Sequence, residues 1–450
     1  MAKPDLDPGR FARTALTLLK LALPLSAGML FQVAFNLVDA FFIGRIGTDA
    51  FAAVNLASFS IWLLSAVIGV VGTGANARIA QARGAGDDEA VADIRSQALR
   101  TSLVFGFLTM GAGLAVAEQL TLFMSNWESD NLYAATLADC YLSVTLLACP
   151  IMFLNEALAA TFRGEGDTRT PTLILSAGFV LNALLDPLLI FGYGPIPQLG
   201  VIGAALASCC SFLFSLALFF LARRSWFRNH SDKPGLHLHE TSRMLKIGFP
   251  PSITNIVFCL VYMVVTPYIA TQGTEALAAL GLGHKVISLS YFLCLSFELA
   301  AITMTGESTG ARESAEARYR SWVVVMTSAV MNLVVGLSIV AAAKPVCSIF
   351  TSDPIVLTLA ASYLYIVVPS QVLLGIGMSV EGAFAGFGHT TTPMVISVAS
   401  SLFRWPGVAW VVKTTSYGVP GIWWVFALST YIRGLGLLAL LILDRKSTSS

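Results

Sequence analysis

Long apolar segments separated by short polar segments recur from one end of the chain to the other. A helix that crosses the hydrocarbon core of a bilayer, roughly 30 Å thick, needs about 20 mostly apolar residues, and these segments are of that length. The pattern predicts an all-α integral membrane protein with twelve transmembrane helices. The predicted spans are residues 18–45, 52–78, 97–121, 134–162, 169–193, 198–222, 244–271, 277–307, 320–344, 355–385, 392–415 and 418–443.

The composition supports this interpretation, because hydrophobic residues make up 56% of the 450 positions and charged residues only 12%. The mean hydropathy is +0.75, which is too high for a soluble globular domain of this length. The first apolar segment is too long for a signal peptide and contains Pro24 and Asp39, so we expect it to stay in the protein as a helix. Most of the chain is therefore expected to face a lipid bilayer.

Lys and Arg are distributed unevenly between alternate loops. One set of loops holds 21 of the 27 Lys and Arg residues, whereas the opposite loops hold only Arg45, Lys344 and Lys413. In membrane proteins the excess of positive charge marks the cytoplasmic loops. The alternation predicts a multi-pass protein of the cell inner membrane with both termini in the cytoplasm, and it supports the number of helices.

The chain lacks the signatures of an enzyme or an ATP-driven pump. Its seven cysteines show no metal-ligand spacing, and no Gly-rich phosphate loop is present. We expect no enzyme activity and no cofactor, so transport would be driven by an ion gradient or by the gradient of the substrate. The expected partners of this monomer are a small organic substrate and the lipid bilayer, and no nucleic acid.

The sequence contains an internal duplication, which aligns in three successive registers. The first register pairs Pro24 with Pro250, Ser26 with Ser252 and Gly84 with Gly310, the second pairs residues 162–171 with 384–393, and the third pairs Gly200 with Gly418. The duplication predicts an N-terminal six-helix lobe at 1–222, a cytoplasmic linker at 223–243 and a C-terminal six-helix lobe at 244–450. Because each repeat holds an even number of spans, we expect a pseudo-two-fold axis along the membrane normal and alternating access to the two sides.

Two acidic residues lie inside the predicted spans of the N-terminal lobe. Asp39 and Asp186 each lie six residues before the outer end of a span, so at about 1.5 Å per residue both are roughly 9 Å below the outer surface. Asn182 lies one turn before Asp186 on the same helix face, where its amide could hydrogen-bond either carboxylate. Carboxylates inside a membrane are costly and usually functional. We expect these three residues to couple transport to a cation, either as a proton site or as ligands of a sodium ion.

Protonation of this acid pair is expected to act as the switch. A neutral pair tolerates a dry pocket, whereas an ionised pair recruits water, a cation or a cationic substrate. Pro24 lacks a backbone N–H and so offers a hinge in the first helix, through which the pocket could change shape. The repeat places two valines, Val265 and Val408, at the corresponding positions of the second half, which favours a function for the acids over duplicated packing.

Two acids of the second half are candidates for substrate contact. Glu298 lies near the middle of its span, and Glu381 lies near the cytoplasmic end of another, where its side chain could also reach the membrane surface. Lys285 and Arg404 could serve as counter-ions, as backbone anchors or as ligands. Structural and functional roles stay open for all four residues.

Several segments resemble the multidrug and toxic compound extrusion (MATE) family, in order and over nearly the whole chain. These segments are residues 22–47, 161–173, 181–192, 200–208, 310–313, 381–393 and 404–406. The Asn-x-x-x-Asp-Pro sequence at 182–187 is most similar to the subgroup of DNA-damage-inducible (DinF-like) members, whose N-terminal half carries the cation site. The second half departs from the family, because His389 replaces the usual acid and residues 252–267 contain no Asp or Glu. We therefore expect no sodium site there.

Together these features predict an antiporter, coupled to protons or to sodium, that exports small amphipathic organic cations by alternating access. A flippase for lipid-linked precursors is the nearest alternative, although its cavity should hold several bases for pyrophosphate and only Lys285, Arg404 and Arg433 lie inside spans. A membrane enzyme or a channel is a remoter alternative, since the sequence shows no catalytic cluster and no repeated pore motif.

Overall fold

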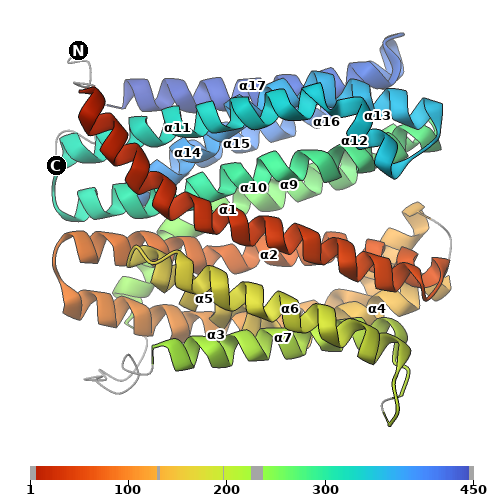
Figure 1. The fold of residues 1–450 in the computed structure, drawn as a ribbon, viewed down its shortest axis with the longest axis horizontal. Helices are drawn as coiled ribbons and strands as arrows, with labels where there is room; N and C mark the ends of the chain where they lie inside the picture. The colour runs from red at the N-terminus through yellow and green to blue at the C-terminus, as the bar shows by residue number, and fades with distance from the viewer. Residues whose placement is uncertain (1–6, 129–131, 196, 224–236, 445–450) are drawn as a thin grey trace. The chain divides into compact units, whose positions relative to one another are not determined.

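The computed structural model describes residues 7–128, 132–195, 197–223 and 237–444, and the regular elements of this part of the chain are helices (Figure 1). A helix satisfies its backbone polar groups internally, which is why apolar runs of this length fold as helices in lipid. In chain order the elements are α1 (Pro8–Gly44), α2 (Thr48–Gly84), α3 (Asp88–Glu128), α4 (Leu132–Leu147), α5 (Cys149–Gly164), α6 (Arg169–Phe191), α7 (Gly200–Ala222), α9 (Leu238–Ala270), α10 (Thr274–Gly310), α11 (Ser314–Ala341), α12 (Ala343–Phe350), α13 (Pro354–Val367), η1 (Val368–Ser370), α14 (Gln371–Phe387), α15 (Thr391–Leu402), α16 (Arg404–Thr414) and α17 (Gly418–Leu443).

The number of spans agrees with the prediction. Among the described residues, eleven helical stretches are long and apolar enough to cross a membrane, and the bent pair of α4 and α5 would make a twelfth. Several helices extend beyond the predicted spans, as α1 does by beginning at Pro8 and α10 by ending at Gly310. The reason is that an apolar segment ends at the first charged side chain, whereas the helix continues past it.

Three predicted spans are interrupted well inside their bounds, and each of these interruptions lies close to a proline. The span predicted at 134–162 is bent by 51° at Ala148, because Pro150 has no N–H for the carbonyl four residues earlier and its ring crowds that carbonyl. Pro369 lies in the 3₁₀ turn between α13 and α14. Pro406 lies in the first turn of α16, just after the break that separates it from α15.

The chain divides into two compact units that do not follow the boundary between the repeats. Unit 1 comprises Met1–Ser26, Ala80–Gly86 and Phe249–Ser450, and unit 2 comprises Ala27–Ile79 and Asp87–Gly248. Each unit thus lacks the beginning of the first helix of its own repeat and contains the beginning of the first helix of the other repeat.

Most of the predicted linker at 223–243 falls on residues 224–236, which lie outside the described residues. The predicted lobes at 1–222 and 244–450 differ from the two compact units only in short helix segments. These segments change unit because the chain passes from one unit to the other inside α1, inside α9 and at both ends of the Ala80–Gly86 stretch.

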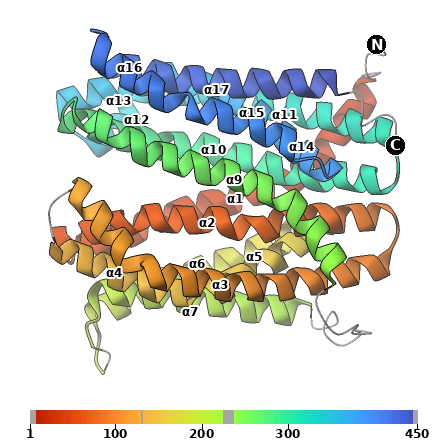
Figure 2. The ribbon, with the colours of Figure 1, turned by 180° about the vertical axis from the view of Figure 1, so that it is seen from behind.

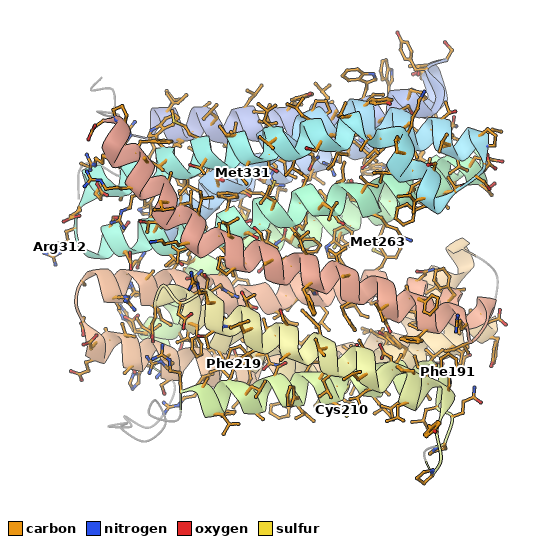
Figure 3. All side chains as sticks on the ribbon, viewed as in Figure 1. Phe191, Cys210, Phe219, Met263, Arg312 and Met331 are labelled. Atoms are coloured by element: carbon orange, nitrogen blue, oxygen red, sulfur yellow. The ribbon has the colours of Figure 1, made fainter. Side chains whose placement is uncertain are left out.

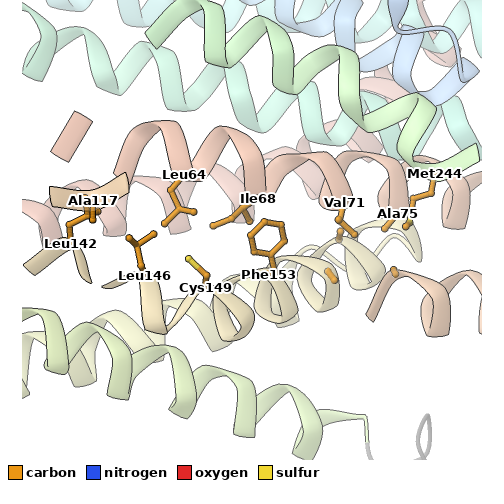
Figure 4. Packing of buried hydrophobic residues seen from close by; sticks show 13 residues of the cluster. Leu64, Ile68, Val71, Ala75, Ala117, Leu142, Leu146, Cys149, Phe153 and Met244 are labelled. Atoms are coloured by element: carbon orange, nitrogen blue, oxygen red, sulfur yellow. The ribbon is translucent and has the colours of Figure 1, made fainter. Parts of the chain in front are cut away.

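The core of unit 2 is formed mainly by α2, α3, α4 and α5, and Met244 at the start of α9 joins it (Figure 4). Figure 2 shows α3, α4 and α7 side by side in this unit. Gly74 of α2 lies against the carbonyl of Met244, and Gly248 of α9 lies against the carbonyl of Val70, closer than a Cβ would allow. Small residues therefore let the start of α9 pack directly on α2.

The start of α1 takes the corresponding place in unit 1. Leu18 and Ala22 are buried in a cluster with Phe297 and Ala300 of α10. The first register of the repeat aligns Ala22 with Gly248, and it aligns α10 with α2. The first helix of each repeat is thus exchanged in the same way.

The end of α2 also belongs to unit 1, where it packs against α10. Gly84 lies against the carbonyl of Glu307, and Gly310 lies against the carbonyl of Gln81, each closer than a Cβ would allow. The first register of the repeat relates Gly84 to Gly310 and Gln81 to Glu307, so each contact is the repeat image of the other. Reciprocal contacts of this kind are produced by a two-fold axis, as the sequence predicted for the repeats.

Candidate functional site

α1 and α6 run side by side in the same direction within unit 2. Gly28 of α1 faces Thr172 of α6, whose Cγ2 would lie 2.6 Å from a Cβ at position 28. Seven residues further along both helices, the rings of Phe35 and Phe179 stack with centroids 5.4 Å apart. The glycine thus permits a close approach, and the paired rings fix the register of the two helices.

Asp39 and Asp186 lie at the same level of this parallel pair. Each lies five residues before the last residue of its helix. Beyond them Phe42 meets Phe191 edge to face with centroids 6.3 Å apart, and Figure 3 labels Phe191 at this end of α6. Asp186 is fully buried and Asp39 is half-buried. The two carboxyl groups are close enough to interact electrostatically. The structure therefore brings together the two acids selected from the sequence.

Tyr141 of α4 completes a group that we call the acid pocket, which consists of Asp39, Tyr141, Asn182 and Asp186. The phenol of Tyr141 is buried and interacts electrostatically with both carboxyl groups. Tyr141 also belongs to a buried apolar cluster with Ile43, Ala50, Ala57, Ile190, Val201, Ala204 and Ala205. The pocket thus borders an apolar core, where an uncompensated charge is costly.

Oxygen atoms of the acid pocket lack donors within the described residues. Both carboxylate oxygens of Asp186 and Oδ1 of Asn182 are buried and make no hydrogen bond. The amide of Asn182 donates to Oγ of Ser208 at 3.4 Å, and not to a carboxylate as the sequence suggested, because α7 packs against this face of α6. Pro187 has no N–H to donate to the carbonyl of Ala183. Buried acceptors without donors are costly, so this group of oxygens is suited to accept a proton, a water molecule or a cation.

The chemistry of these donors limits which cation they suit. Carboxylate, amide and carbonyl oxygens are ligands of hard cations, and a carboxylate can also take a proton. Within the described part of the chain, no group of three or more His, Cys, Asp or Glu side chains could hold a metal ion. The acid pocket therefore fits a proton or a monovalent cation better than a transition metal.

The candidate hinge lies at a boundary between the compact units. Pro24 is inside α1, and its missing N–H leaves the carbonyl of Lys20 without the usual helical donor. Two residues later, after Ser26, α1 passes from unit 1 to unit 2. In α9 the chain passes between the units after Gly248, next to Pro250, the repeat counterpart of Pro24.

The two candidate acids of unit 1 gather around one arginine. Glu381 forms a half-buried ion pair with Arg433 of α17, with Nη2 2.6 Å from Oε2. Ser397 of α15 donates to the other oxygen of Glu381 and accepts from Nε of Arg433 at 3.2 Å. Glu298 interacts electrostatically with both charged groups and, within the described residues, makes no hydrogen bond or ion pair. Glu381 therefore points to Arg433 and not to the membrane surface.

Sequence reasoning missed Tyr141 and the pairing of Arg433. The repeat held a signal for the first, since its second register aligns Tyr141 with Tyr363. The partners Glu381 and Arg433 are 52 residues apart on different helices, and no periodicity in the sequence links them.

A family model described as MatE matches the chain twice, over residues 24–188 and 250–410. The two matches begin at Pro24 and Pro250, which the first register of the repeat aligns, and the second register aligns the positions where they end. The predicted duplication is therefore confirmed.

Curated relatives cover most of the chain. A probable multidrug resistance protein NorM of Thermotoga maritima is 28% identical over 412 residues, which are 90% of this chain and 87% of the relative. A protein of the same name from Deinococcus radiodurans is 28% identical over 427 residues, 93% of each chain. A FAD transporter of Shewanella oneidensis is 26% identical over 387 residues, 85% of this chain and 84% of the relative.

Solved structures show the same fold. A MOP superfamily transporter from Pyrococcus furiosus aligns with a TM-score of 0.87 at 22% identity and covers 96% of this chain and 95% of its own. A MATE structure in the straight conformation aligns with a TM-score of 0.86 at 22% identity and covers 96% of both chains. Because the MatE model matches well over half of the residues, the chain belongs to the MATE family of membrane transporters and is not an enzyme.

Proposed function

We propose that the chain is an antiporter that exports small amphipathic organic compounds, mainly cations, in exchange for a proton or a sodium ion. It acts as a monomer in the cell inner membrane, with both termini in the cytoplasm and without a cofactor. The relatives named multidrug resistance proteins support efflux as the direction of transport. One relative is named a FAD transporter, so cargo differs among related chains.

The observation that carries this proposal is the fully buried carboxyl group of Asp186. Its two oxygens make no hydrogen bond within the described residues, and the carboxyl group of Asp39 lies close by. Two ionised carboxylates beside an apolar core would be strongly unfavourable. A bound proton or cation removes this cost, and its release restores it.

Exchange follows from competition for the same negative charge. With a proton or a cation bound, the acid pocket carries one negative charge fewer and better tolerates a closed, dry state. When that cation leaves, the ionised pair favours a state that admits water and a cationic substrate. Because the coupling cation and a cationic substrate compete for the same two carboxylates, the binding of one disfavours the binding of the other, which is the requirement for antiport.

The flippase alternative has less support. A pyrophosphate group needs several bases together, but Arg433 is occupied by Glu381. Lys285 is exposed on α10. Of the three bases inside spans, this leaves Lys285 and Arg404, which are too few for a pyrophosphate.

Neutral substitutions in the acid pocket test the proposal. In a drug-sensitive strain, Asp186→Asn and Asp39→Asn should each reduce drug resistance to the level of cells without the transporter, at unchanged protein levels, because Asn cannot exchange a proton. Asp88→Asn is the matched control, since Asp88 is exposed at the start of α3 and should keep full resistance. Full resistance of both pocket variants would overturn the proposal.

The coupling ion is tested in proteoliposomes. Efflux of a cationic dye should follow an imposed proton gradient or an imposed sodium gradient, and the effective gradient identifies the ion. The Asp186→Asn variant should respond to neither. Dye transport that is independent of both gradients would contradict cation coupling while leaving the transporter fold intact.

A further inference from the structure

Unit 1 contains a polar group at the position that the repeat assigns to the acid pocket of unit 2. The second register of the repeat aligns Arg404 with Asn182 and Tyr363 with Tyr141. The two acids, Asp39 and Asp186, correspond to Val265 and Val408. The same scaffold therefore carries carboxylates in one unit and a guanidinium in the other.

Arg404 is surrounded by aromatic rings. Its guanidinium carbon lies 4.9 Å from the ring centroid of Phe258, 5.4 Å from that of Tyr262 and 5.5 Å from that of Phe426. The rings of His284, Tyr363 and Trp423 continue the contacts, with centroids 5.0–5.8 Å apart along the series Tyr262, His284, Tyr363 and Trp423. We call this group the arginine–aromatic cluster, and its members are Phe258, Tyr262, His284, Tyr363, Arg404, Trp423 and Phe426.

The cluster contains buried donors without acceptors. Arg404 is 8% exposed, and it donates from Nε to Oγ of Ser429 at 2.6 Å and from Nη2 to Oγ1 of Thr430 at 3.3 Å. Its Nη1 atom and Nε1 of the fully buried Trp423 make no hydrogen bond within the described residues. Over the same part of the chain, Arg404 has no carboxylate partner.

These donors are the opposite of what the acid pocket offers. There, buried oxygens lack a donor, and here, Nη1 of a permanently charged guanidinium and an indole N–H lack an acceptor. The faces of the surrounding rings attract the guanidinium, but they cannot neutralise its charge. The cluster therefore requires an anionic or strongly accepting group.

We propose that the arginine–aromatic cluster binds a small aromatic compound that carries an anionic group, either a phosphate or a carboxylate. The guanidinium fork pairs with such a group through two parallel hydrogen bonds, and the rings stack on the aromatic body. This proposal rests on the proposed function in one respect only, namely that the ligand is cargo of the transporter. It extends the cargo from cations to aromatic anions, recognised by residues outside the acid pocket.

A structural role alone does not account for these atoms. The bonds to Ser429 and Thr430 hold the start of α16 against α17 through Nε and Nη2, and the guanidinium also interacts with the phenol of Tyr262. These contacts leave Nη1 and the indole N–H of Trp423 unexplained. Arg404 also lies ten residues before the end of α16, about 15 Å along the helix, so a lipid head group at the surface is not its natural partner.

Binding of 4-methylumbelliferyl phosphate to the full-length protein in phosphatidylcholine nanodiscs tests the proposal. The phosphate should bind about 10-fold or more tightly than 4-methylumbelliferone, which has the same rings and no phosphate. Arg404→Gln should abolish this preference, and Arg404→Lys should keep part of it, because lysine retains the charge and loses the fork. Trp423→Phe keeps a ring but removes the N–H, and should weaken binding of the phosphate several-fold.

Equal affinity for the two probes, or an unchanged preference in folded Arg404→Gln protein, would overturn the proposal. If Arg404→Gln does not elute as a monodisperse protein, unchanged affinity of the Trp423→Phe variant would overturn it instead. Loss of probe binding in discs that contain phosphatidylglycerol would assign the site to an anionic lipid and overturn a soluble ligand. Asp186→Asn should bind the probe normally while failing to transport, so a failure of cation coupling is distinguished from a failure of this site.

Discussion

Buried charged side chains in this protein differ in how completely they are compensated. Glu381 is paired with Arg433 and also accepts a hydrogen bond from Ser397. Asp186, in contrast, has no donor, and Arg404 has no carboxylate partner, within the described residues. Full compensation is typical of a structural ion pair, whereas a buried charged group without a partner is a candidate position for a ligand or a proton.

The ion pair of Glu381 should matter mainly for stability. Replacing Glu381 by Met leaves Arg433 buried and unpaired, which should cost about 3–5 kcal/mol of the free energy of unfolding. The melting temperature of the detergent-solubilised protein, followed by intrinsic fluorescence, should therefore fall. Glu298→Met is the control, because Glu298 makes no hydrogen bond or ion pair within the described residues, and its melting temperature should change little.

The double variant Glu381→Met/Arg433→Met sharpens this test, since an apolar pair of similar volume removes both buried charges. It should recover most of the lost melting temperature. If the single variant Glu381→Met melted at the same temperature as the double variant, pairing with Glu381 would not be what stabilises buried Arg433.

At this scale the sequence identified the right residue types but not their partners. Asp39, Asp186 and Asn182 could be selected because a polar side chain inside an apolar run is conspicuous. Their hydrogen bonds could not be predicted, because the amide of Asn182 bonds to Ser208, which lies on a helix that only the fold places beside α6. The aromatic rings around Arg404 were equally hidden, because an aromatic residue is unremarkable in any membrane span.

At the scale of helices, prolines inside the predicted spans of this chain either lie within a continuous helix or lie beside a break. Pro24 and Pro187 stay inside continuous helices, whereas Pro150 and Pro406 lie beside breaks. Spans could be predicted because lipid forces each long apolar run into a helix. Breaks could not, because neighbouring helices decide whether the freed carbonyl is accommodated by a bend or by an interruption.

The retained Pro24 should control how easily α1 bends. Pro24→Ala restores an N–H for the carbonyl of Lys20 and should stiffen the helix. The rate of dye efflux in proteoliposomes should fall several-fold, while the melting temperature should stay the same or rise. Pro8→Ala is the matched control, because Pro8 is the first residue of α1, where no helical N–H bond is needed. Efflux by Pro24→Ala at the rate of the Pro8→Ala control would contradict a hinge.

At the scale of the whole molecule, the duplication and the charge pattern make a prediction about sidedness. In a variant without the seven native cysteines, Glu89→Cys at the start of α3 should react with an impermeant maleimide only from the cytoplasmic side. Lys413→Cys at the end of α16 should react only from outside, because that loop belongs to the charge-poor set. Both side chains are exposed. Labelling of both positions from one side would require a different number of spans between them.

The exchanged helix segments have a consequence for the origin of this architecture. In unit 1, Leu18 and Ala22 from the first repeat cover residues of the second, and in unit 2 the reverse holds for Met244 and Gly248. If an ancestral gene encoded a single repeat, its product could therefore complete its core only as a dimer in which two identical chains exchanged the start of their first helix, as in domain swapping. Fusion of two such genes would have freed assembly from its dependence on protein concentration.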